Sequence, residues 1–423
     1  MQKETIALHA GYDKKEGYGS MSVPIAQTTA YAFRDSEHAA NLFALKELGP
    51  IYGRLTNPTS DVLEQRFAAL EGGAAAISTA SGQAAIFYAI VNVAEAGDNI
   101  IISDKLYGGA VTLLAHTLKR FGIEARVFKS KDASNLEEQI DDKTKAIFFE
   151  SLSNPQIAIT DVEKVVEIAK RNGVLTVCDN TVATPALFNP IEWGVDVVVH
   201  STSKYVNGQG TAIGGMVVER DGLAEFFKQN DKRYYHFTTP DESYHGLVYT
   251  DVPLPNFCLR IRLALLRDIG ATQSPHNSWL LIQTLETLAL RVDKHSDNAL
   301  EVAKYLESNP KVKAVNYPGL ESNEHHEKAQ KYFKGGKASG LISFEAESFE
   351  EARKIIDSTK LFSVVVNIGD SKSLITHPAS TTHSQMNEKE LIEAGINPAT
   401  VRLSIGLENT TDLIADLDQA INK

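Results

Sequence analysis

Apolar runs and helical patterns alternate between residues 58 and 256, and this alternation limits the possible folds more than any other feature. Strands are expected at 74–78, 99–103, 124–128, 146–150, 174–178, 195–199 and 216–219, and helices at 83–93, 110–121 and 162–171. Strands that alternate with helices at this spacing form βαβ units around a mostly parallel sheet. The sequence therefore predicts an α/β fold.

The regions on either side of this alternation have different patterns. Residues 1–57 hold one helical pattern, at 36–48, and are expected to form an arm rather than a domain. Residues 58–265 are expected to form a large domain that includes an aromatic, loop-rich insertion at 221–256. Residues 266–423 are predicted to form a smaller α+β domain. Its expected elements are a helix at 278–306, strands at 313–317, 341–345 and 362–367, a helix at 348–358 and a closing helix from Thr411.

The composition of the 423 residues argues against several classes of protein. The net charge is −12 and no basic block occurs, which argues against a nucleic-acid partner. No run reaches the roughly 18 apolar residues of a membrane span, and no signal peptide is seen. Only two cysteines occur, Cys178 and Cys258, which is consistent with a reducing compartment. We expect a cytoplasmic protein that binds neither nucleic acid nor membrane.

A lysine follows the strand expected at 195–199. This valine-rich run leads through Ser201 and Ser203 to Lys204. Ligands of open α/β sheets bind beyond the carboxyl ends of the strands, so we expect Lys204 to lie beside a ligand. A lysine whose amine is deprotonated can form a Schiff base. The simpler alternative is a solvated lysine after a strand, which is the commoner fate of a lysine.

The strand expected at 74–78 leads into a helix through Ser81, Gly82 and Gln83. Ser81 is a good N-cap, and Gly82 lets an anion approach the N–H groups at the helix start. The positive end of the helix dipole adds to the attraction. These residues indicate a phosphate site, and a capped helix without a ligand is the alternative.

An acid follows the strand expected at 174–178. Asp179 could cap the next segment, which is the commoner role, or hold the protonated ring nitrogen of a pyridine cofactor. Together, the three strand ends offer a phosphate cradle, an acid for a ring nitrogen and an amine for an aldehyde. These are the three requirements of pyridoxal 5′-phosphate (PLP).

Other motifs match known sites poorly. The glycines between 208 and 215 do not follow the strand–GxGxxG–helix order of a dinucleotide site. His326 and Glu327 lack the second histidine of a zinc HExxH motif, because Gln330 stands in its place. We therefore expect no metal site. Arg402, taken alone, is most simply a surface or salt-bridged arginine.

Seven motifs in the same order resemble those of one enzyme family. They are Tyr52-Gly53-Arg54-Leu55-Thr56-Asn57-Pro58-Thr59, Ser81-Gly82-Gln83-Ala84-Ala85, Tyr107-Gly108-Gly109, Glu150-Ser151-Leu152-Ser153-Asn154-Pro155, Asp179-Asn180-Thr181, His200-Ser201-Thr202-Ser203-Lys204-Tyr205 and Val401-Arg402-Leu403-Ser404-Ile405-Gly406. Over nearly its whole length the chain is similar to the PLP-dependent enzymes of cysteine and methionine metabolism, the cystathionine γ-synthase-like group. The resemblance implies the PLP-dependent transferase fold type I, which is aspartate aminotransferase-like.

The resemblance also implies a role for each matched residue. Lys204 would carry PLP as a Schiff base, Tyr107 would stack on its ring and could take a proton, and Asp179 would pair with the ring nitrogen. Further cofactor contacts are implied for Ser81, Gly82, Gln83, Asn154, Thr181, Ser201 and Ser203, and substrate contacts for Asn154, Asn367 and Arg402. Tyr52 and Arg54 of the arm would reach the phosphate of the neighbouring subunit. A shared site implies a dimer, and the resemblance suggests a homotetramer of two such dimers.

Within the family, residues 367–383 and the insertion around 241–247 most resemble the O-acetylhomoserine sulfhydrylases. The implied reaction replaces the γ-acetate of O-acetyl-L-homoserine by a sulfide donor and gives L-homocysteine for methionine biosynthesis. A methionine or cystathionine γ-lyase and a cystathionine γ-synthase are the alternatives. Methionine γ-lyases typically carry a cysteine where Gly109 stands here. The motifs leave open whether the donor is sulfide, methanethiol or a protein thiocarboxylate, and whether the leaving group is acetyl or succinyl.

Overall fold

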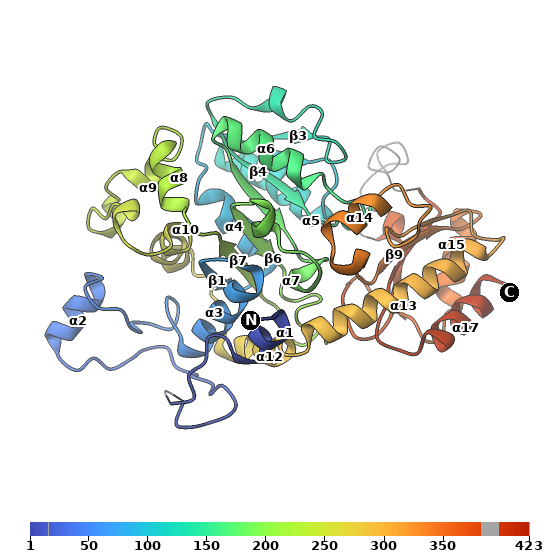
Figure 1. The fold of residues 1–423 in the computed structure, drawn as a ribbon, viewed down its shortest axis with the longest axis horizontal. Coiled ribbons are helices and arrows are strands. Elements are labelled where there is room, and N and C mark those ends of the chain that lie inside the picture. The colour runs from blue at the N-terminus through green and yellow to red at the C-terminus, as the bar shows by residue number, and fades with distance from the viewer. Residues whose placement is uncertain (16, 382–396, 423) are drawn as a thin grey trace.

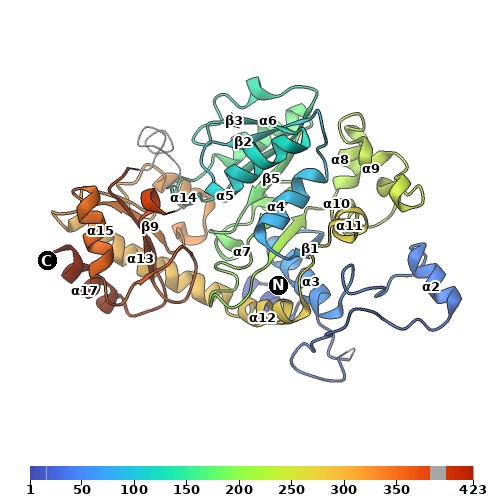
Figure 2. The same cartoon turned by 180° about the vertical axis from the view of Figure 1, so that it is seen from behind.

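The computed structural model describes residues 1–15, 17–381 and 397–422. Two regions, each built around a sheet, lie side by side, and helix α13 (Leu288–Ser308) runs from one toward the other (Figure 1). The segment that carries helix α2 (Ser36–Phe43) extends away from both regions as an arm (Figures 1 and 2). The predicted α/β architecture, with a mostly parallel sheet and a smaller sheet domain, is confirmed.

In the described part of the chain, the large sheet has seven strands in the order β1-β7-β6-β5-β4-β2-β3. The strands are β1 (Ala75–Thr79), β2 (Asn99–Ser103), β3 (Glu124–Phe128), β4 (Thr144–Glu150), β5 (Leu175–Asp179), β6 (Val197–His200) and β7 (Gly215–Glu219). Only β7 pairs antiparallel with its neighbours, and the other pairings in this sheet are parallel. The carboxyl ends of the parallel strands therefore meet at one edge of the sheet.

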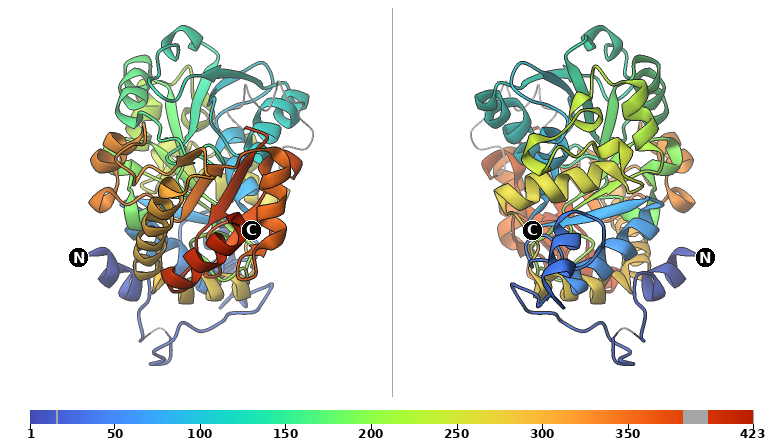
Figure 3. Two further views of the ribbon diagram at one scale, coloured as in Figure 1. Left: turned by 90° about the vertical axis from the view of Figure 1, so that its right-hand side faces the viewer. Right: turned by 90° about the vertical axis from the view of Figure 1, so that its left-hand side faces the viewer.

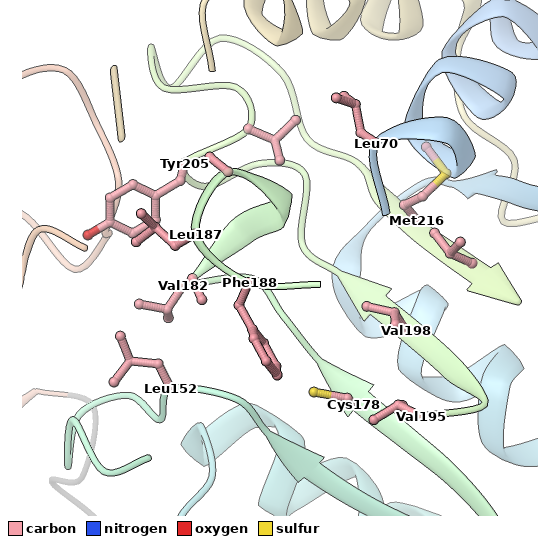
Figure 4. Close-up of a cluster of buried hydrophobic side chains, with 14 of the residues drawn as sticks. Leu70, Leu152, Cys178, Val182, Leu187, Phe188, Val195, Val198, Tyr205 and Met216 are labelled. Atoms are coloured by element: carbon pink, nitrogen blue, oxygen red, sulfur yellow. The ribbon is translucent and has the colours of Figure 1, made fainter. Parts of the chain in front are cut away.

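Helices cover both faces of the large sheet. They include α3 (Pro58–Glu71), α4 (Gly82–Val91), α5 (Gly108–Val111), α6 (Val162–Asn172) and α12 (Pro275–Leu285). Val177 and Val199 of the strands pack into one apolar cluster with α4, whereas Cys178 and Val198 pack into another with α3 and α6. Figure 4 shows Cys178 and Val198 in the second cluster, near Phe188. Burial on both faces explains why these strands read as continuous apolar runs.

The insertion at 221–256 is more ordered than its loop-rich sequence predicted. It contains α8 (Leu223–Gln229), α9 (Tyr235–Thr238), two short 3₁₀ turns (Glu242–Tyr244 and Tyr249–Asp251) and the start of α10 (Asn256–Arg260). The rings of Phe227 and Phe237 stack with their centroids 3.9 Å apart, and Phe257 lies parallel to Phe237 at 6.2 Å. The aromatic residues of the insertion therefore form part of the core that covers the large sheet.

The smaller sheet has the order β10-β11-β12-β9-β8. Its elements are β8 (Ala314–Asn316), β9 (Leu341–Glu345), β10 (Ser363–Val364), β11 (Leu374–Thr376) and β12 (Thr400–Ser404), with helices α14 (His326–Tyr332), α15 (Phe349–Ser358) and α17 (Thr410–Ile421) nearby. Helices α15 and α17 contact each other over this sheet (Figure 3, left, orange and red). Val302 of α13, Ile342 of β9 and Leu417 of α17 share its core.

The prediction of a single helix at 278–306 was wrong, because two helices, α12 and α13, occupy this stretch. Thr287 between them has non-helical dihedral angles (φ −115°, ψ 10°). The guanidinium of Arg291 donates to the carbonyl oxygen of Thr284 at 2.8 Å, so a side chain satisfies a backbone group at the end of α12. Helix α12 contacts α3, whereas α13 reaches the smaller sheet. The domain ranges 1–57, 58–265 and 266–423 stay predictions.

Three further differences lie near the ends of the chain. Helix α1 (Lys3–His9) was not predicted. The helix expected at 36–48 ends at Phe43 because Leu45 adopts a positive φ of 55°. The strand expected at 362–367 is reduced to Ser363–Val364, after which the chain turns and the N–H of Asn367 donates to the carbonyl of Val365. None of the described helices is both long and apolar enough to cross a membrane.

Candidate active site

A cavity of about 300 Å³ lies at the carboxyl edge of the large sheet. The predicted site residues that line it are Ser81, Gly82, Gln83, Tyr107, Asn154, Asp179, Thr181, Ser201, Ser203, Lys204, Asn367 and Arg402. They come from strand ends, from the start of α4 and from the smaller sheet. The fold thus brings together the side chains that the sequence placed at separate strand ends.

Lys204 lies in a turn after β6, and its amine points toward the smaller sheet. Its Nζ donates a hydrogen bond of 2.6 Å to Oδ1 of Asn367. Burial lowers the pKa of the Lys204 amine, and the positive charge of Arg402 lowers it further. A larger share of the amine is therefore neutral, which is the form that attacks an aldehyde or accepts a proton.

Helix α13 holds the backbone that follows Lys204. The guanidinium of Arg291 donates to the carbonyl oxygens of Tyr205 at 2.7 Å and Val206 at 3.0 Å. One turn further along the helix, Nδ1 of His295 lies 2.6 Å from the carbonyl oxygen of Ile405. Thus one helix contacts the segment after Lys204 and the segment after Arg402.

Asp179 lies at the end of β5, beside the end of β6. Its Oδ1 accepts hydrogen bonds from the N–H and the hydroxyl of Thr181, at 2.9 and 2.5 Å. The hydroxyl oxygen of Thr181 in turn accepts from the N–H of Ser201 at 2.8 Å. Burial raises the pKa of Asp179, while the bonds from Thr181 and the nearby His200 act in the opposite direction. This network fixes the carboxylate against the segment that carries Lys204.

The start of α4 closes another side of the cavity. The Oγ of Ser81 accepts from the N–H of Ala84 at 3.1 Å, as expected of an N-cap. Gly82 packs so closely on Ser201 that a Cβ atom there would lie 2.6 Å from the Cβ of Ser201. The side chain of Gln83 donates to the carbonyl of Gly109 at 2.9 Å. A helix start beside the hydroxyl of Ser201 is suited to bind an anion.

Ser203 makes contacts that the sequence did not suggest. Its Oγ donates to the carbonyl of Gly214 at 3.2 Å and accepts from the N–H of Gly214 at 3.0 Å. Ser203 therefore joins the turn after β6 to the segment before β7. Its hydroxyl lines the cavity while being held by the backbone.

Glu150 lines the cavity, although the sequence assigned it no role. One carboxylate oxygen accepts from the N–H of Tyr107 at 2.6 Å, and the other accepts from the N–H of Asn154 at 3.1 Å. Burial and the neighbouring Asp179 raise the pKa of Glu150 well above its usual value. Its position at the end of a predicted strand, beside Asp179 in the sheet, was the signal that could have identified it.

Arg402 lies on β12 and is 4% exposed. Its guanidinium donates to Oδ1 of Asn154 at 3.0 Å and to the carbonyl oxygen of Asn367 at 3.1 Å. Its buried Nε has no hydrogen-bond partner among the described residues. Burial lowers the pKa of Arg402 to about 10, so the side chain remains charged at neutral pH. A buried guanidinium with an unused N–H is suited to bind a carboxylate.

Apolar side chains complete the wall, and sequence reasoning did not identify them. They are Ile86, Leu152, Val182, Ile213, Val366 and Ile368. Such residues carry no chemical signature in a sequence, because any strand or helix contains them. Their effect is to limit the access of water to the polar groups.

Tyr52 and Arg54 do not line this cavity. They line a separate one together with Thr272 and Ser274, and the guanidinium of Arg54 lies 5.1 Å from the centre of the Tyr52 ring. Their contact with a neighbouring subunit stays a prediction.

Two last features concern the limits of the site. The motif quoted at 367–383 ends with Thr382 and His383, which lie outside the described residues. Within residues 1–15, 17–381 and 397–422, no group of three or more His, Cys, Asp or Glu side chains is arranged to hold a metal ion.

Comparison with known proteins gives consistent results over the full chain. Residues 4–422 match the family model of the Cys/Met metabolism PLP-dependent enzymes. An O-acetyl-L-homoserine sulfhydrylase of Leptospira meyeri is 46% identical over 99% of this chain and 96% of its own length. The enzyme of the same name from Corynebacterium glutamicum is 43% identical over 98% of this chain and 95% of its own length.

Two solved structures share the fold. A putative O-acetylhomoserine (thiol)-lyase of Campylobacter jejuni superposes with a TM-score of 0.97 at 58% identity, covers all of both chains and carries pyridoxyl-lysine monophosphate at its position 205. The metB protein of Corynebacterium glutamicum superposes with a TM-score of 0.84 at 32% identity, covering all of this chain and 98% of that one.

Proposed function

Because the chain belongs to the Cys/Met metabolism PLP-dependent enzymes, we propose that it is an O-acetylhomoserine sulfhydrylase. The reaction replaces the acetate at Cγ of O-acetyl-L-homoserine by sulfide and yields L-homocysteine, a step of methionine biosynthesis. The observation that carries this proposal is full-length similarity to relatives that bear this name, at 43–46% identity.

The residues that line the cavity fit PLP. The start of α4 and the hydroxyl of Ser201 would hold its phosphate, Asp179 its ring nitrogen, and Lys204 its aldehyde carbon. Lys204 is the only lysine that lines the cavity in the described part of the chain, and the Campylobacter jejuni structure carries the cofactor on a lysine. When bound, PLP supplies an aldehyde for an amine and a ring that accepts electrons.

The protein groups around the cofactor divide the remaining tasks. Arg402, through its unused Nε–H, and the side chain of Asn154 would bind the α-carboxylate of the substrate. The amine of Lys204, with its lowered pKa, would take the proton from Cα of the substrate and return it at the end. The apolar wall would exclude water, which otherwise could hydrolyse the reacting substrate before sulfide arrives.

An assay with a panel of substrates tests this function. Purified protein loaded with PLP is incubated with O-acetyl-L-homoserine and sulfide, and separately with methionine or cystathionine. We expect homocysteine from the first mixture and little 2-oxobutyrate from the others. Release of 2-oxobutyrate from methionine at a rate equal to or above that of homocysteine synthesis would instead identify a γ-lyase.

The same assay tests the donor and the leaving group. We propose free sulfide as the donor and acetate as the leaving group. Product formation, followed by mass spectrometry, should be slower when methanethiol replaces sulfide. It should also be slower when the succinyl ester replaces the acetyl ester. A faster reaction with either substitute would overturn that part of the proposal.

We also propose a homotetramer in which each site receives Tyr52 and Arg54 from a neighbouring subunit. The support is that both residues lie on the arm, residues 1–57, and outside the cavity of their own chain. The inactive variants Lys204→Ala and Arg54→Ala should regain activity when they are mixed under conditions that exchange subunits. In a mixed dimer, one site then combines an intact Lys204 with an intact Arg54. No regain of activity after proven exchange would contradict shared sites.

A further inference from the structure

We propose that Glu150 is a positioning residue that fixes Tyr107 and Asn154 together, and so sets the site at Arg402 for the α-carboxylate of the substrate. The inference rests on the proposed function, because it assumes an amino-acid substrate. It assigns a task to an acid that is not needed for the proposed steps.

The two oxygens of Glu150 serve two different segments of the chain. One accepts from the N–H of Tyr107, at the turn that starts α5, at 2.6 Å. The other accepts from the N–H of Asn154, in the loop after β4, at 3.1 Å. A carboxyl group is suited to this task because it has two oxygens, each of which can accept a hydrogen bond. One side chain thus sets the distance between a residue over the cofactor site and a residue at the substrate site.

Glu150 is itself held in place. It is 4% exposed, it ends β4, and it is paired in the sheet with Asp179. Its carbonyl oxygen accepts from the hydroxyl of Thr160 at 2.7 Å. Because hydrogen bonds hold both its main chain and its side chain, Glu150 keeps Tyr107 and Asn154 at fixed positions relative to the sheet.

A continuous set of hydrogen bonds leads from Glu150 to the reactive amine. Asn154, whose N–H is held by Glu150, accepts from Arg402 at 3.0 Å through its side chain. Arg402 also donates to the carbonyl of Asn367 at 3.1 Å. Asn367 accepts from the amine of Lys204 at 2.6 Å. A displacement of Asn154 would therefore first move the guanidinium of Arg402, which is the group expected to bind the α-carboxylate of the substrate.

The alternative is that Glu150 is only a structural buried acid. Two other buried glutamates are paired with basic side chains, Glu64 with Arg262 and Glu71 with His200. Glu219 is also buried, and it accepts from the backbone N–H of Cys258. The hydrogen bonds described for Glu150 come from two backbone N–H groups. Burial of an acid without a cation is costly, and Glu150 differs from Glu219 because its two oxygens hold two separate segments, Tyr107 and Asn154, that line the cavity.

The test compares two ligands that differ only in the carboxylate. L-Norvaline has the α-amine and the α-carboxylate but no leaving group, and 1-aminobutane is the same molecule without the carboxylate. Binding of each is followed by the change in absorption of the PLP-loaded protein, which needs no turnover. The variants are Glu150→Gln, which replaces one acceptor oxygen by an NH₂ group, and Glu150→Asp, which keeps the carboxyl group but shortens the side chain.

We expect Glu150→Gln to weaken the binding of norvaline on the order of tenfold, since one buried N–H loses its acceptor. The affinity for 1-aminobutane should change less than about twofold, because its binding uses no contact to Arg402. Glu219→Gln is the matched control. Glu219 is 1% exposed and accepts from the N–H of Cys258, but it does not line the cavity. This control should affect the two ligands equally.

The opposite results are equally clear. Equal weakening of both ligands in Glu150→Gln, or unchanged affinity for norvaline, would overturn the positioning role. If Glu150→Gln does not fold, Glu150→Asp takes its place and is judged by the same selective loss. A wild-type protein that binds norvaline but makes no homocysteine would overturn the proposed function, while leaving this measurement of Glu150 valid.

Discussion

The amine of Lys204 donates a 2.6 Å hydrogen bond to the side-chain oxygen of Asn367, across the boundary between the two sheets. Lys204 follows β6 of the large sheet, and Asn367 precedes β11 of the smaller one. Asn367 therefore provides a hydrogen-bond acceptor for the amine of Lys204 whenever that amine is not bonded to the cofactor.

Asn367→Ala removes the acceptor for this amine. We expect kcat to fall roughly tenfold, the effect of one lost hydrogen bond at a reacting group, while PLP stays bound. Asn367→Asp should raise the pKa of Lys204, because a carboxylate favours the charged amine. The rise of kcat with pH would then move to higher pH. Rate profiles from about pH 6 to 10 measure both effects, and an unchanged profile in Asn367→Asp would contradict the contact.

Lys204→Ala should abolish the covalent link to PLP and the formation of homocysteine. Borohydride reduction followed by mass spectrometry of peptides detects the link. The control is Lys372→Ala, a lysine with a 74% exposed side chain, which should retain both properties. Full activity in Lys204→Ala would exclude this residue from the reaction.

Arg402→Ala should weaken substrate binding by about 2–5 kcal/mol, if its buried charge pairs with the α-carboxylate. The effect should appear mainly as a higher KM for O-acetyl-L-homoserine, with the KM for sulfide unchanged. Arg34→Ala is a control on the arm, since the side chain of Arg34 is 69% exposed. An unaltered KM for the amino acid would remove Arg402 from the site.

Gly82→Ala should impair the binding of PLP. A Cβ at this position would lie 2.6 Å from the Cβ of Ser201 and would push α4 away from the segment after β6. Overpacking of this kind costs about 1–3 kcal/mol. Equilibrium dialysis should show weaker retention of PLP. In Gly49→Ala the added Cβ meets the flexible end of Leu42 at 3.1 Å, so this variant should retain the cofactor.

Glu219 should make the stability depend on pH. Burial raises the pKa of Glu219 from 4.5 to about 7, so the folded state keeps a proton that the unfolded state releases. The shifted pKa contributes roughly 3 kcal/mol to the free energy of unfolding. This contribution is fully present below about pH 4.5 and is lost as the pH rises from about 4.5 to 7. Glu219→Gln, which cannot ionise, should flatten this part of the curve. Urea denaturation at several pH values measures the slope, and equal slopes in both proteins would be inconsistent with a raised pKa.

Local patterns in the sequence were sufficient to predict the large sheet. The strands expected at 99–103 and 124–128 have the observed bounds. The first is an apolar run that is buried throughout and has polar residues at both ends, whereas the second is an edge strand that is only partly buried. The break between α12 and α13 was missed because it depends on Arg291 reaching back to Thr284, and periodicity does not reveal such a contact. Short edge strands such as β10 were also misjudged, since only tertiary pairing defines them.

The candidate site was predictable where chemistry marks a residue. A lysine, an aspartate and a serine–glycine turn at expected strand ends made Lys204, Asp179 and Ser81 candidates, with a simpler role left open for each. The structure brings the three into one cavity, and their roles stay predictions. Arg402 looked like an ordinary surface or salt-bridged arginine until a resemblance to known enzymes singled it out. Glu150 had a place in a motif but no role, because its importance lies in two backbone N–H groups that no sequence pattern specifies.

Helix α13 limits how far Lys204 and Arg402 can move apart. Arg291 ties the helix to the backbone just after Lys204, and His295, one turn later, ties it to the backbone just after Arg402. Because α13 is a continuous helix, these two contacts keep the two backbone segments at a constant distance. Tilting of the smaller sheet therefore cannot open a gap between the amine and the guanidinium unless α13 bends or one of these contacts breaks.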